Sequence, residues 1–275
     1  MTNTSLERNT KQKTPNNILK MIKSNCLNYG VFFLGYIFIY ILISTLLPLV
    51  FGVTSMTSTI ITNIVITVLS LFLYFRSRYK LQLPSFKSHN ALTLRQILFW
   101  CFYMIVMSYL LLLFFQWFRL NVYDESMIRR SEDMQQYSIV FYLFFSCILA
   151  PLAEESMIRL YSYNQLKRSS NWIISMIVSS FVFAALHGTF THIIIATFFG
   201  VILTLSYEYT GCCVIPILGH SIYNFMALFT TDAMFFGDNN IAVMIAAILF
   251  IIIVIFQTVK LNNKMKSIKY KDMIS

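Results

Sequence analysis

Charged residues are scarce in this sequence. Only 12% of its 275 residues are charged, whereas 57% are hydrophobic. A soluble domain carries roughly 25% charged and about 45–50% apolar residues. So little charge cannot cover the surface of a soluble globule of this length, and the mean hydropathy of +0.68 points the same way. The composition therefore excludes disordered, collagen-like and ordinary soluble classes, and it indicates a membrane protein with several spans.

Cysteine and acidic residues are also few. Acidic residues number 11 against 21 basic ones, which gives a net charge of +10. A nucleic-acid-binding protein needs a basic face on a soluble domain, but here the basic residues separate long apolar runs and fit membrane anchors. We therefore expect a lipid bilayer, and no nucleic acid, around this chain. The cysteines lie in or beside apolar runs without metal-site spacing, so we expect no disulfide framework; they are Cys26, Cys101, Cys147, Cys212 and Cys213.

Stretches without any charge determine the number of spans, because a membrane helix needs about 20 apolar residues. No charged residue occurs between Lys23 and Arg76, which leaves room for two spans separated by a Ser/Thr-rich break at 52–59. Similar stretches farther along give six more. The predicted fold class is therefore all-α, a polytopic membrane helix bundle of about eight transmembrane helices. The expected cores are 29–51, 58–75, 97–118, 137–160, 171–187, 191–207, 212–230 and 240–258.

Basic residues are distributed unequally between the two sides of this bundle. An even number of spans places both termini on one side, and 18 of the 21 Lys and Arg residues fall there. Only Arg119, Arg129 and Arg130 fall on the other side. The positive-inside rule then predicts an integral membrane protein with both termini cytoplasmic, which we expect in a bacterial cell membrane. No internal repeat is visible, so an inverted-repeat transporter gains no support.

The fourth predicted span contains two adjacent carboxylates and an arginine. Ionisable side chains at membrane depth are costly and are functional hypotheses by default. Glu155 and Arg159 are four residues apart and can meet on one helix face, whereas Glu154 points about 100° away from Glu155. One carboxylate can thus be neutralised while the other remains free to act as a base. The alternative is a helix end with an ordinary surface ion pair.

Two further patterns place histidines inside predicted spans. His187 follows Phe183 by one helical turn in the fifth span, so the phenyl ring should pack beside the imidazole. In the seventh span, His220 and Asn224 share a face, and both side chains can donate hydrogen bonds to a developing oxyanion. The alternatives are a structural histidine at 187 and simple interhelical hydrogen bonding by the 220/224 pair. At 1.5 Å per residue, all three patterns can lie at one depth in the bilayer.

The three patterns EExxxR, FxxxH and HxxxN, in this order, resemble the CPBP family of CAAX proteases and bacteriocin-processing proteins, also called Abi. The resemblance covers about residues 135–230, and the FFGV segment at 198–201 is similar to the glycine-containing helix of that family. It implies an intramembrane endopeptidase that hydrolyses a peptide bond of a membrane-associated protein or peptide. Together with the span count, it predicts a cytoplasmic tail (1–27), three transmembrane helices and their loops (28–134), a catalytic core (135–230), and a last helix with a basic cytoplasmic tail (231–275).

The resemblance also implies roles for six polar side chains, in pairs. Glu154 and His187 would activate a water. Glu155 and Arg159 would support and orient the site. His220 and Asn224 would stabilise an oxyanion.

The need for a metal is open at this point. Glu154, His187 and His220 could hold zinc as three protein ligands with one open position. However, the two-histidine HExxH helix motif is absent, and a water activated by glutamate and histidine accounts for the same residues without a cation. We therefore expect no cofactor, with zinc as the alternative. The alternative function is a non-catalytic membrane scaffold or a bacteriocin-immunity protein, although a scaffold would need none of the six polar side chains.

Overall fold

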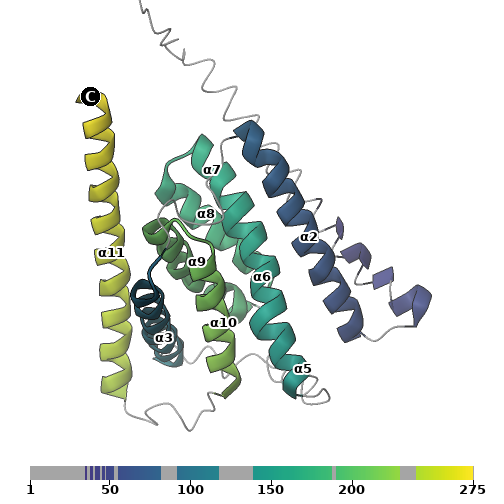
Figure 1. Cartoon of the computed structure of the whole chain (residues 1–275). Helices are drawn as coiled ribbons and strands as arrows, with labels where there is room; N and C mark the ends of the chain where they lie inside the picture. The colour runs from purple at the N-terminus through teal and green to yellow at the C-terminus, as the bar shows by residue number, and fades with distance from the viewer. Residues whose placement is uncertain are drawn as a thin grey trace, which may run out of the picture.

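The described part of the computed structural model is helical and contains no strand (Figure 1). The predicted tail at 1–27 and the loop that carries Arg119, Arg129 and Arg130 lie outside this part. The structure describes residues 35, 38–39, 41–43, 45–46, 48–52, 55–81, 92–117, 139–187, 190–229 and 240–274.

Most of the helices correspond to predicted spans. Two of the segments, labelled η, are π-helical and the remainder are α-helical. In chain order they are α2 (Ser55–Leu81), α3 (Leu94–Trp117), α5 (Ile139–Phe144), η2 (Phe145–Leu149), α6 (Ala150–Glu155), η3 (Ser156–Tyr163), α7 (Asn164–Ser169), α8 (Trp172–Ala185), α9 (Phe190–Thr210), α10 (Val214–Phe229) and α11 (Asn240–Ile274).

Eight apolar helical segments occur among the described residues, and each overlaps one of the predicted spans, although several extend a few residues beyond the predicted bounds. Four are long and apolar enough to cross a membrane: Leu94–Phe114, Ile139–Arg168, Phe190–Thr210 and Ile241–Lys264. Four are shorter: Ile41–Phe51, Ile60–Arg76, Trp172–Ala185 and Val214–Ala227. Large apolar side chains such as Phe102 of α3 and Phe256 of α11 are exposed on the outside, as lipid contact allows. The chain is therefore an integral membrane protein with an all-α helix bundle, as predicted.

The segments from α5 to α7 join into one continuous rod, which we call the 139–169 rod (Figure 1). In the view of Figure 1, α2 and α11 flank the bundle on opposite sides, and α8, α9, α10 and α3 lie between them. The carboxyl-terminal ends of α2, the rod and α11 lie at the same end of the bundle. The predicted topology requires this arrangement. That this end faces the cytoplasm stays a prediction.

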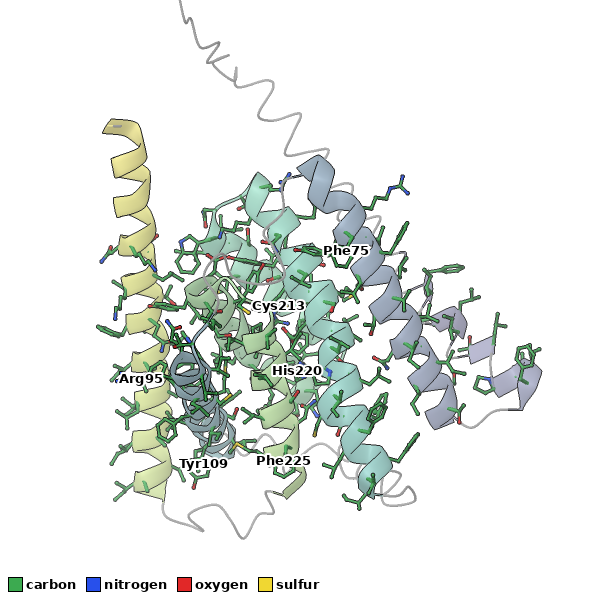
Figure 2. All side chains as sticks on the ribbon, in the orientation of Figure 1. Phe75, Arg95, Tyr109, Cys213, His220 and Phe225 are labelled. Carbon is green, nitrogen blue, oxygen red and sulfur yellow. The ribbon has the colours of Figure 1, made fainter. Side chains whose placement is uncertain are left out.

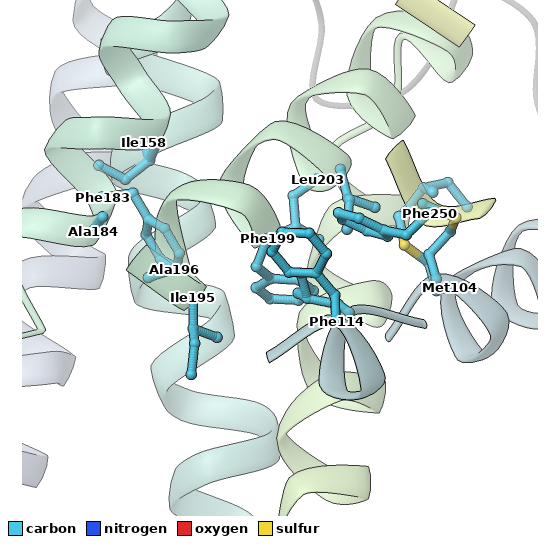
Figure 3. Close-up of a cluster of buried hydrophobic side chains, with 14 of the residues drawn as sticks. Met104, Phe114, Ile158, Phe183, Ala184, Ile195, Ala196, Phe199, Leu203 and Phe250 are labelled. Atoms are coloured by element: carbon cyan, nitrogen blue, oxygen red, sulfur yellow. The ribbon is translucent and has the colours of Figure 1, made fainter. Parts of the chain in front are cut away.

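Aromatic and branched side chains fill the centre of the bundle. Figure 3 shows this core, with side chains from α3, α8, α9, α11 and the rod. Phe114 of α3 lies 5.3 Å from Phe198 of α9 and 5.5 Å from Phe250 of α11, measured between ring centroids. Such pairs contribute about 0.5–1.5 kcal/mol each beyond the area they bury. The core thus packs α9 against α3 and α11, and Tyr209 of α9 also donates to the carbonyl of Gln257 on α11 at 2.9 Å.

Helices α8 and α9 pack closely at a glycine. A Cβ atom on Gly200 would lie 2.9 Å from Cβ and 3.0 Å from Cα of Ser180. Small residues allow this close approach, which is how helices associate in lipid. Because the neighbour is backbone, a larger residue at 200 would have to push the two helices apart.

The 139–169 rod departs from regular α-helix on both sides of α6. Pro151, in the first turn of α6, has no N–H, and its ring crowds the carbonyl four residues earlier,. The π-helical segments η2 and η3 lie directly before and after α6. The side-chain amide of Asn164, the first residue of α7, donates to the η3 carbonyls of Arg159 (2.9 Å) and Leu160 (3.0 Å). Rare π segments recur at functional sites, and α6 ends with both adjacent glutamates.

A salt bridge joins the end of the rod to α9. Lys167 Nζ lies 2.6 Å from Oε1 and 2.7 Å from Oε2 of Glu208, and it also lies over the ring of Tyr163. The lysine side chain is 32% exposed. The pair of Lys167 and Glu208 is therefore less buried than the pair of Glu155 and Arg159, and it serves as a reference for that pair.

Candidate active site

The predicted pairing of Glu155 with Arg159 is present at the centre of the bundle. Arg159 Nη1 donates to Glu155 Oε1 at 3.0 Å, and Nε lies 3.0 Å from Oε2. Both side chains are fully buried. One charge-assisted hydrogen bond and one further ion-pair contact thus join the two side chains, since Nε and Oε2 make no hydrogen bond,. The surface alternative for this pair is therefore excluded.

Arg159 also reaches two other helices. Its Nη2 donates to the carbonyl of Gly200 on α9 at 3.1 Å. Its guanidinium carbon lies 4.8 Å from the ring centroid of Phe183 on α8. One buried cation thus holds the rod, α8 and α9 in a fixed relation, and the contact with Gly200 depends on the close α8–α9 packing.

His220 of α10 lies between the two adjacent glutamates. Its Nδ1 is 2.9 Å from Glu155 Oε1, and its Nε2 is 4.0 Å from Glu154 Oε2. Ring edges of Phe183 and Phe199 pack against the imidazole at 5.6 and 5.4 Å between centroids. Figure 2 shows His220 between α10 and the rod. The carboxylate of Glu155 cannot donate while it is ionised, so Nδ1 carries the hydrogen in this contact.

Glu154 differs from Glu155 in both pairing and exposure. Its side chain is 22% exposed, and among the described residues no hydrogen bond reaches its Oε2. The structure therefore has the asymmetry that the sequence predicts, with one carboxylate neutralised by arginine and the other without an Arg or Lys partner in the described part, 4.0 Å from His220 Nε2. Such a carboxylate is suited to accept a proton.

His187 lies just beyond the end of α8, because that helix ends at Ala185 and not at 187 as predicted. Its Nδ1 lies 3.0 Å from the carbonyl of Phe183, and its ring packs at 4.8 Å from the Phe183 ring, as the FxxxH spacing predicts. A carbonyl only accepts, so this contact places the hydrogen on Nδ1 and leaves the lone pair on Nε2 in the neutral ring. Phe183 thus contacts both His187 and His220.

Asn224 does not contact the other predicted site residues through its amide nitrogen. Its Nδ2 donates to the carbonyl of Ser146 in η2 at 2.7 Å. The expected role of Asn224 at an oxyanion stays a prediction, and the structure shows a different contact for it. A second histidine, His192 of α9, has its ring centroid 6.2 Å from that of His187, although its sequence position lies outside the three motifs.

The residues that could hold zinc do not form a ligand group. Among the described residues, no three His, Cys, Asp or Glu side chains gather in positions that could bind a metal ion. Glu154, His187 and His220 are all described, so the alternative zinc ligand set does not fit this geometry. The expectation of no cofactor stays a prediction.

The three sequence motifs do not indicate several contacts of the site. The carbonyl of Gly200 accepts from both Arg159 and Thr204 (2.8 Å), and only the glycine itself marks the position in the sequence. The Cys213 thiol lies 3.9 Å from the carbonyl of Glu155. Which main-chain carbonyl or aromatic ring a site residue contacts depends on how the helices pack. The spacing of residues along the chain therefore does not reveal these contacts.

Comparison with known proteins identifies the segment that carries this site. Residues 136–226 match the family model described as type II CAAX prenyl endopeptidase Rce1-like. This segment is similar to the CAAX protease family. The match includes all six predicted site residues and confirms the resemblance found in the sequence.

A curated relative supports the same family. The membrane-embedded CAAX protease MroQ of Staphylococcus aureus (strain USA300) is 34% identical over 98 residues, which are 33% of this chain and 40% of that protein. The chain therefore aligns with less than half of this CAAX protease relative. No solved structure matches the chain.

Proposed function

We propose that the chain is an intramembrane endopeptidase that hydrolyses a peptide bond of a membrane-associated protein or peptide. The observation that carries the proposal is the asymmetry of the two adjacent carboxylates. Glu155 is fully buried and paired with Arg159, whereas Glu154 is half-buried beside His220. The CAAX protease family of residues 136–226 supports a hydrolase. A bacterial cell membrane as its location is supported by the staphylococcal relative.

Glu154 acts as the general base of the proposed reaction. It takes a proton from a water whose oxygen attacks the scissile carbonyl carbon, and His187 orients that water through Nε2. The proton then passes from Glu154 to the leaving amine nitrogen as the C–N bond breaks. Glu155 and Arg159 stay charged throughout and hold the site in place. His220 can donate to the oxyanion from Nε2 only when both ring nitrogens carry hydrogen, because Nδ1 faces Glu155,.

The substrate of the proposed reaction is delivered within the membrane. An open apolar groove lies next to the site, between α3, η2 and α10. Its lining is suited to an apolar segment and not to a charged ligand; it consists of Ile105, Cys147, Ser221, Ile222, Phe225 and Met226. Whether the substrate carries a prenyl group is tested directly by comparing a farnesylated peptide with its unmodified form.

The deciding experiment changes Glu154 to glutamine, which keeps its size and removes the base. Peptides from membranes of cells with the wild-type chain are compared with those from cells with Glu154→Gln, and a peptide that accumulates in the variant becomes the probe for purified protein in detergent. We expect cleavage of this probe to fall about 10²–10⁴-fold. Glu208→Gln is the matched control, because Glu208 pairs with Lys167 at the end of the rod; it should cleave normally.

The same assay tests the metal alternative. Activity that persists in a strong chelator agrees with the glutamate-dependent mechanism. Activity that is lost in the chelator and returns with zinc would make Glu154, His187 and His220 ligands instead. Full activity of Glu154→Gln would contradict both mechanisms and favour the non-catalytic scaffold.

A further inference from the structure

Tyr223 lies in the turn of α10 that follows His220. The two residues are three positions apart, so their side chains are neighbours on the helix surface. The Tyr223 ring stacks on Phe199 of α9, with 4.2 Å between the ring centroids and 29° between the ring planes. The same phenylalanine packs against the imidazole of His220 at 5.4 Å. One aromatic ring of α9 thus contacts both Tyr223 and a residue of the candidate site.

Tyr223 is accessible although it belongs to the interior of the bundle. The residue lies deep among the helices and packs against the hydrophobic core. It is nevertheless only half-buried, so the surrounding side chains leave part of it uncovered. The side chain of Glu154 is also accessible, with 22% of its surface exposed. A molecule that enters the bundle to reach Glu154 can therefore also contact Tyr223.

The hydroxyl of Tyr223 has no hydrogen-bond partner among the described residues. Buried tyrosines normally have one, and two other tyrosines between the helices do. Tyr103 donates to Oε1 of Gln257 at 2.7 Å, and Tyr209 donates to the carbonyl of the same residue at 2.9 Å. An unmade hydrogen bond inside a membrane protein costs free energy, which a phenylalanine at 223 would avoid. The hydroxyl is therefore available to a ligand.

The neighbouring polar side chains of α10 are already engaged within the protein. Ser221 donates to a carbonyl of its own helix at 2.9 Å, and Asn224 donates to a carbonyl of η2 at 2.7 Å. His220 contacts Glu155 through Nδ1. In contrast, the hydrogen of the Tyr223 hydroxyl has no acceptor in the described part of the chain.

The proposed reaction brings an acceptor for this hydrogen. A peptide segment that is extended across the site has main-chain carbonyls without partners in the segment itself, and the bilayer core offers no water to serve them. Buried carbonyls of this kind must then find donors in the protein. A tyrosine hydroxyl is suited to this contact, because it donates a hydrogen bond without carrying a charge.

We propose that Tyr223 is a substrate-binding residue whose hydroxyl donates to a main-chain carbonyl oxygen of the bound peptide. This inference rests on the proposed function for the nature of the ligand. It adds a donor at a position that the HxxxN motif leaves unspecified.

The test compares Tyr223→Phe with Tyr103→Phe as its matched control. Both variants keep the aromatic ring and lose one hydroxyl, but only the hydroxyl of Tyr103 has a partner among the described residues. Tyr223→Phe should therefore change the unfolding temperature in detergent by less than about 1 °C, whereas Tyr103→Phe should lower it by about 2–6 °C. A loss in Tyr223→Phe as large as that in the control would show that the hydroxyl serves the fold, and it would overturn the proposal.

Binding of a peptide probe measures the contact with a ligand directly. The probe is an acetylated tripeptide aldehyde of leucine, which is apolar, has main-chain carbonyls and resembles the tetrahedral intermediate when its aldehyde is hydrated. Its dissociation constant follows from the rise of the unfolding temperature with probe concentration. We expect Tyr223→Phe to bind the probe about 3- to 30-fold more weakly than the wild-type chain, and Tyr103→Phe to bind it as tightly. Equal binding to the wild-type chain and Tyr223→Phe, or no binding to the wild-type chain, would overturn the proposal.

Cleavage separates this proposal from the proposed function. For the membrane peptide that accumulates in Glu154→Gln, kcat/KM should fall in Tyr223→Phe by a factor similar to the loss of probe binding, and it should stay unchanged in Tyr103→Phe. A normal kcat/KM in Tyr223→Phe would refute a contact between its hydroxyl and the substrate. If the wild-type chain cleaves nothing but binds the probe through the Tyr223 hydroxyl, the proposed function fails, while the role of Tyr223 in peptide binding is supported.

Discussion

Replacing Arg159 by alanine should destabilise the protein as well as inactivate it. The guanidinium makes two contacts of 3.0 Å with Glu155 and one of 3.1 Å with the carbonyl of Gly200, and no water replaces it because both charged side chains are fully buried. Removing one partner of a buried ion pair costs about 3–5 kcal/mol. Since folded proteins are stable by only about 5–15 kcal/mol, this loss is a large fraction of the total. We expect the unfolding temperature in detergent to fall by on the order of 10 °C and the amount in the membrane to drop severalfold.

A paired replacement separates stability from catalysis. In Glu155→Gln/Arg159→Met the buried charge disappears together with its partner, and such exchanges are often neutral for stability. The double variant should therefore regain at least half of the lost unfolding temperature while cleavage stays absent. Lys167→Ala is the comparison variant: the Lys167 side chain is 32% exposed and that of its partner Glu208 is 6% exposed, whereas both side chains of the Glu155–Arg159 pair are fully buried, so its loss should cost less than the loss of Arg159. The measurements are thermal unfolding of purified protein and its abundance in membranes.

Two outcomes would contradict this reasoning. Arg159→Ala with normal abundance, unfolding temperature and activity would show that the buried pair contributes nothing. A double variant less stable than Arg159→Ala would show that the contacts with Gly200 and Phe183, and not the uncompensated charge of Glu155, account for the loss.

Two further predictions follow from packing and topology. Gly200→Ala should cost about 1–3 kcal/mol, because its Cβ would meet the backbone of Ser180; Gly219→Ala should cost less, since its Cβ would meet the flexible end of a methionine side chain. Unfolding temperatures decide this, and equal effects of the two substitutions would refute the close α8–α9 approach. Reporter fusions after Lys260 and after Arg130 should mark opposite sides of the membrane; the same side for both would mean that the span count is wrong by at least one.

Contacts between residues four positions apart were predictable from the sequence. The spacing of Glu155 and Arg159, and that of Phe183 and His187, fixes a shared face whatever the neighbouring helices do. Both pairs are in contact in the structure. The number and order of the apolar helices were predictable for a similar reason, because span length and the scarcity of charge are properties of each segment alone.

Contacts between helices were not predictable in the same way. His220 and Asn224 share a face of α10, as the sequence implies, but one meets Glu155 and the other meets Ser146. The partners depend on the register between α10 and the rod, and that register depends on two π segments that a 3.6-residue pattern does not reveal. Pro151 is the sequence feature that indicates an irregular helix at this point. Proline alone, however, does not specify a π-helical hydrogen-bond pattern.

The shortness of α8 bears on how water reaches the site. Its 14 residues extend about 21 Å, whereas the hydrocarbon layer is about 30 Å thick. A helix this short is accommodated when the bilayer thins beside it. Since α8 begins at Trp172, next to the basic end of the rod, the missing length lies at its other end, where His187 follows. Each peptide bond hydrolysed consumes one water molecule, and the shortest route for that molecule is expected to run through this thinned region, from the face of the membrane opposite the basic loops.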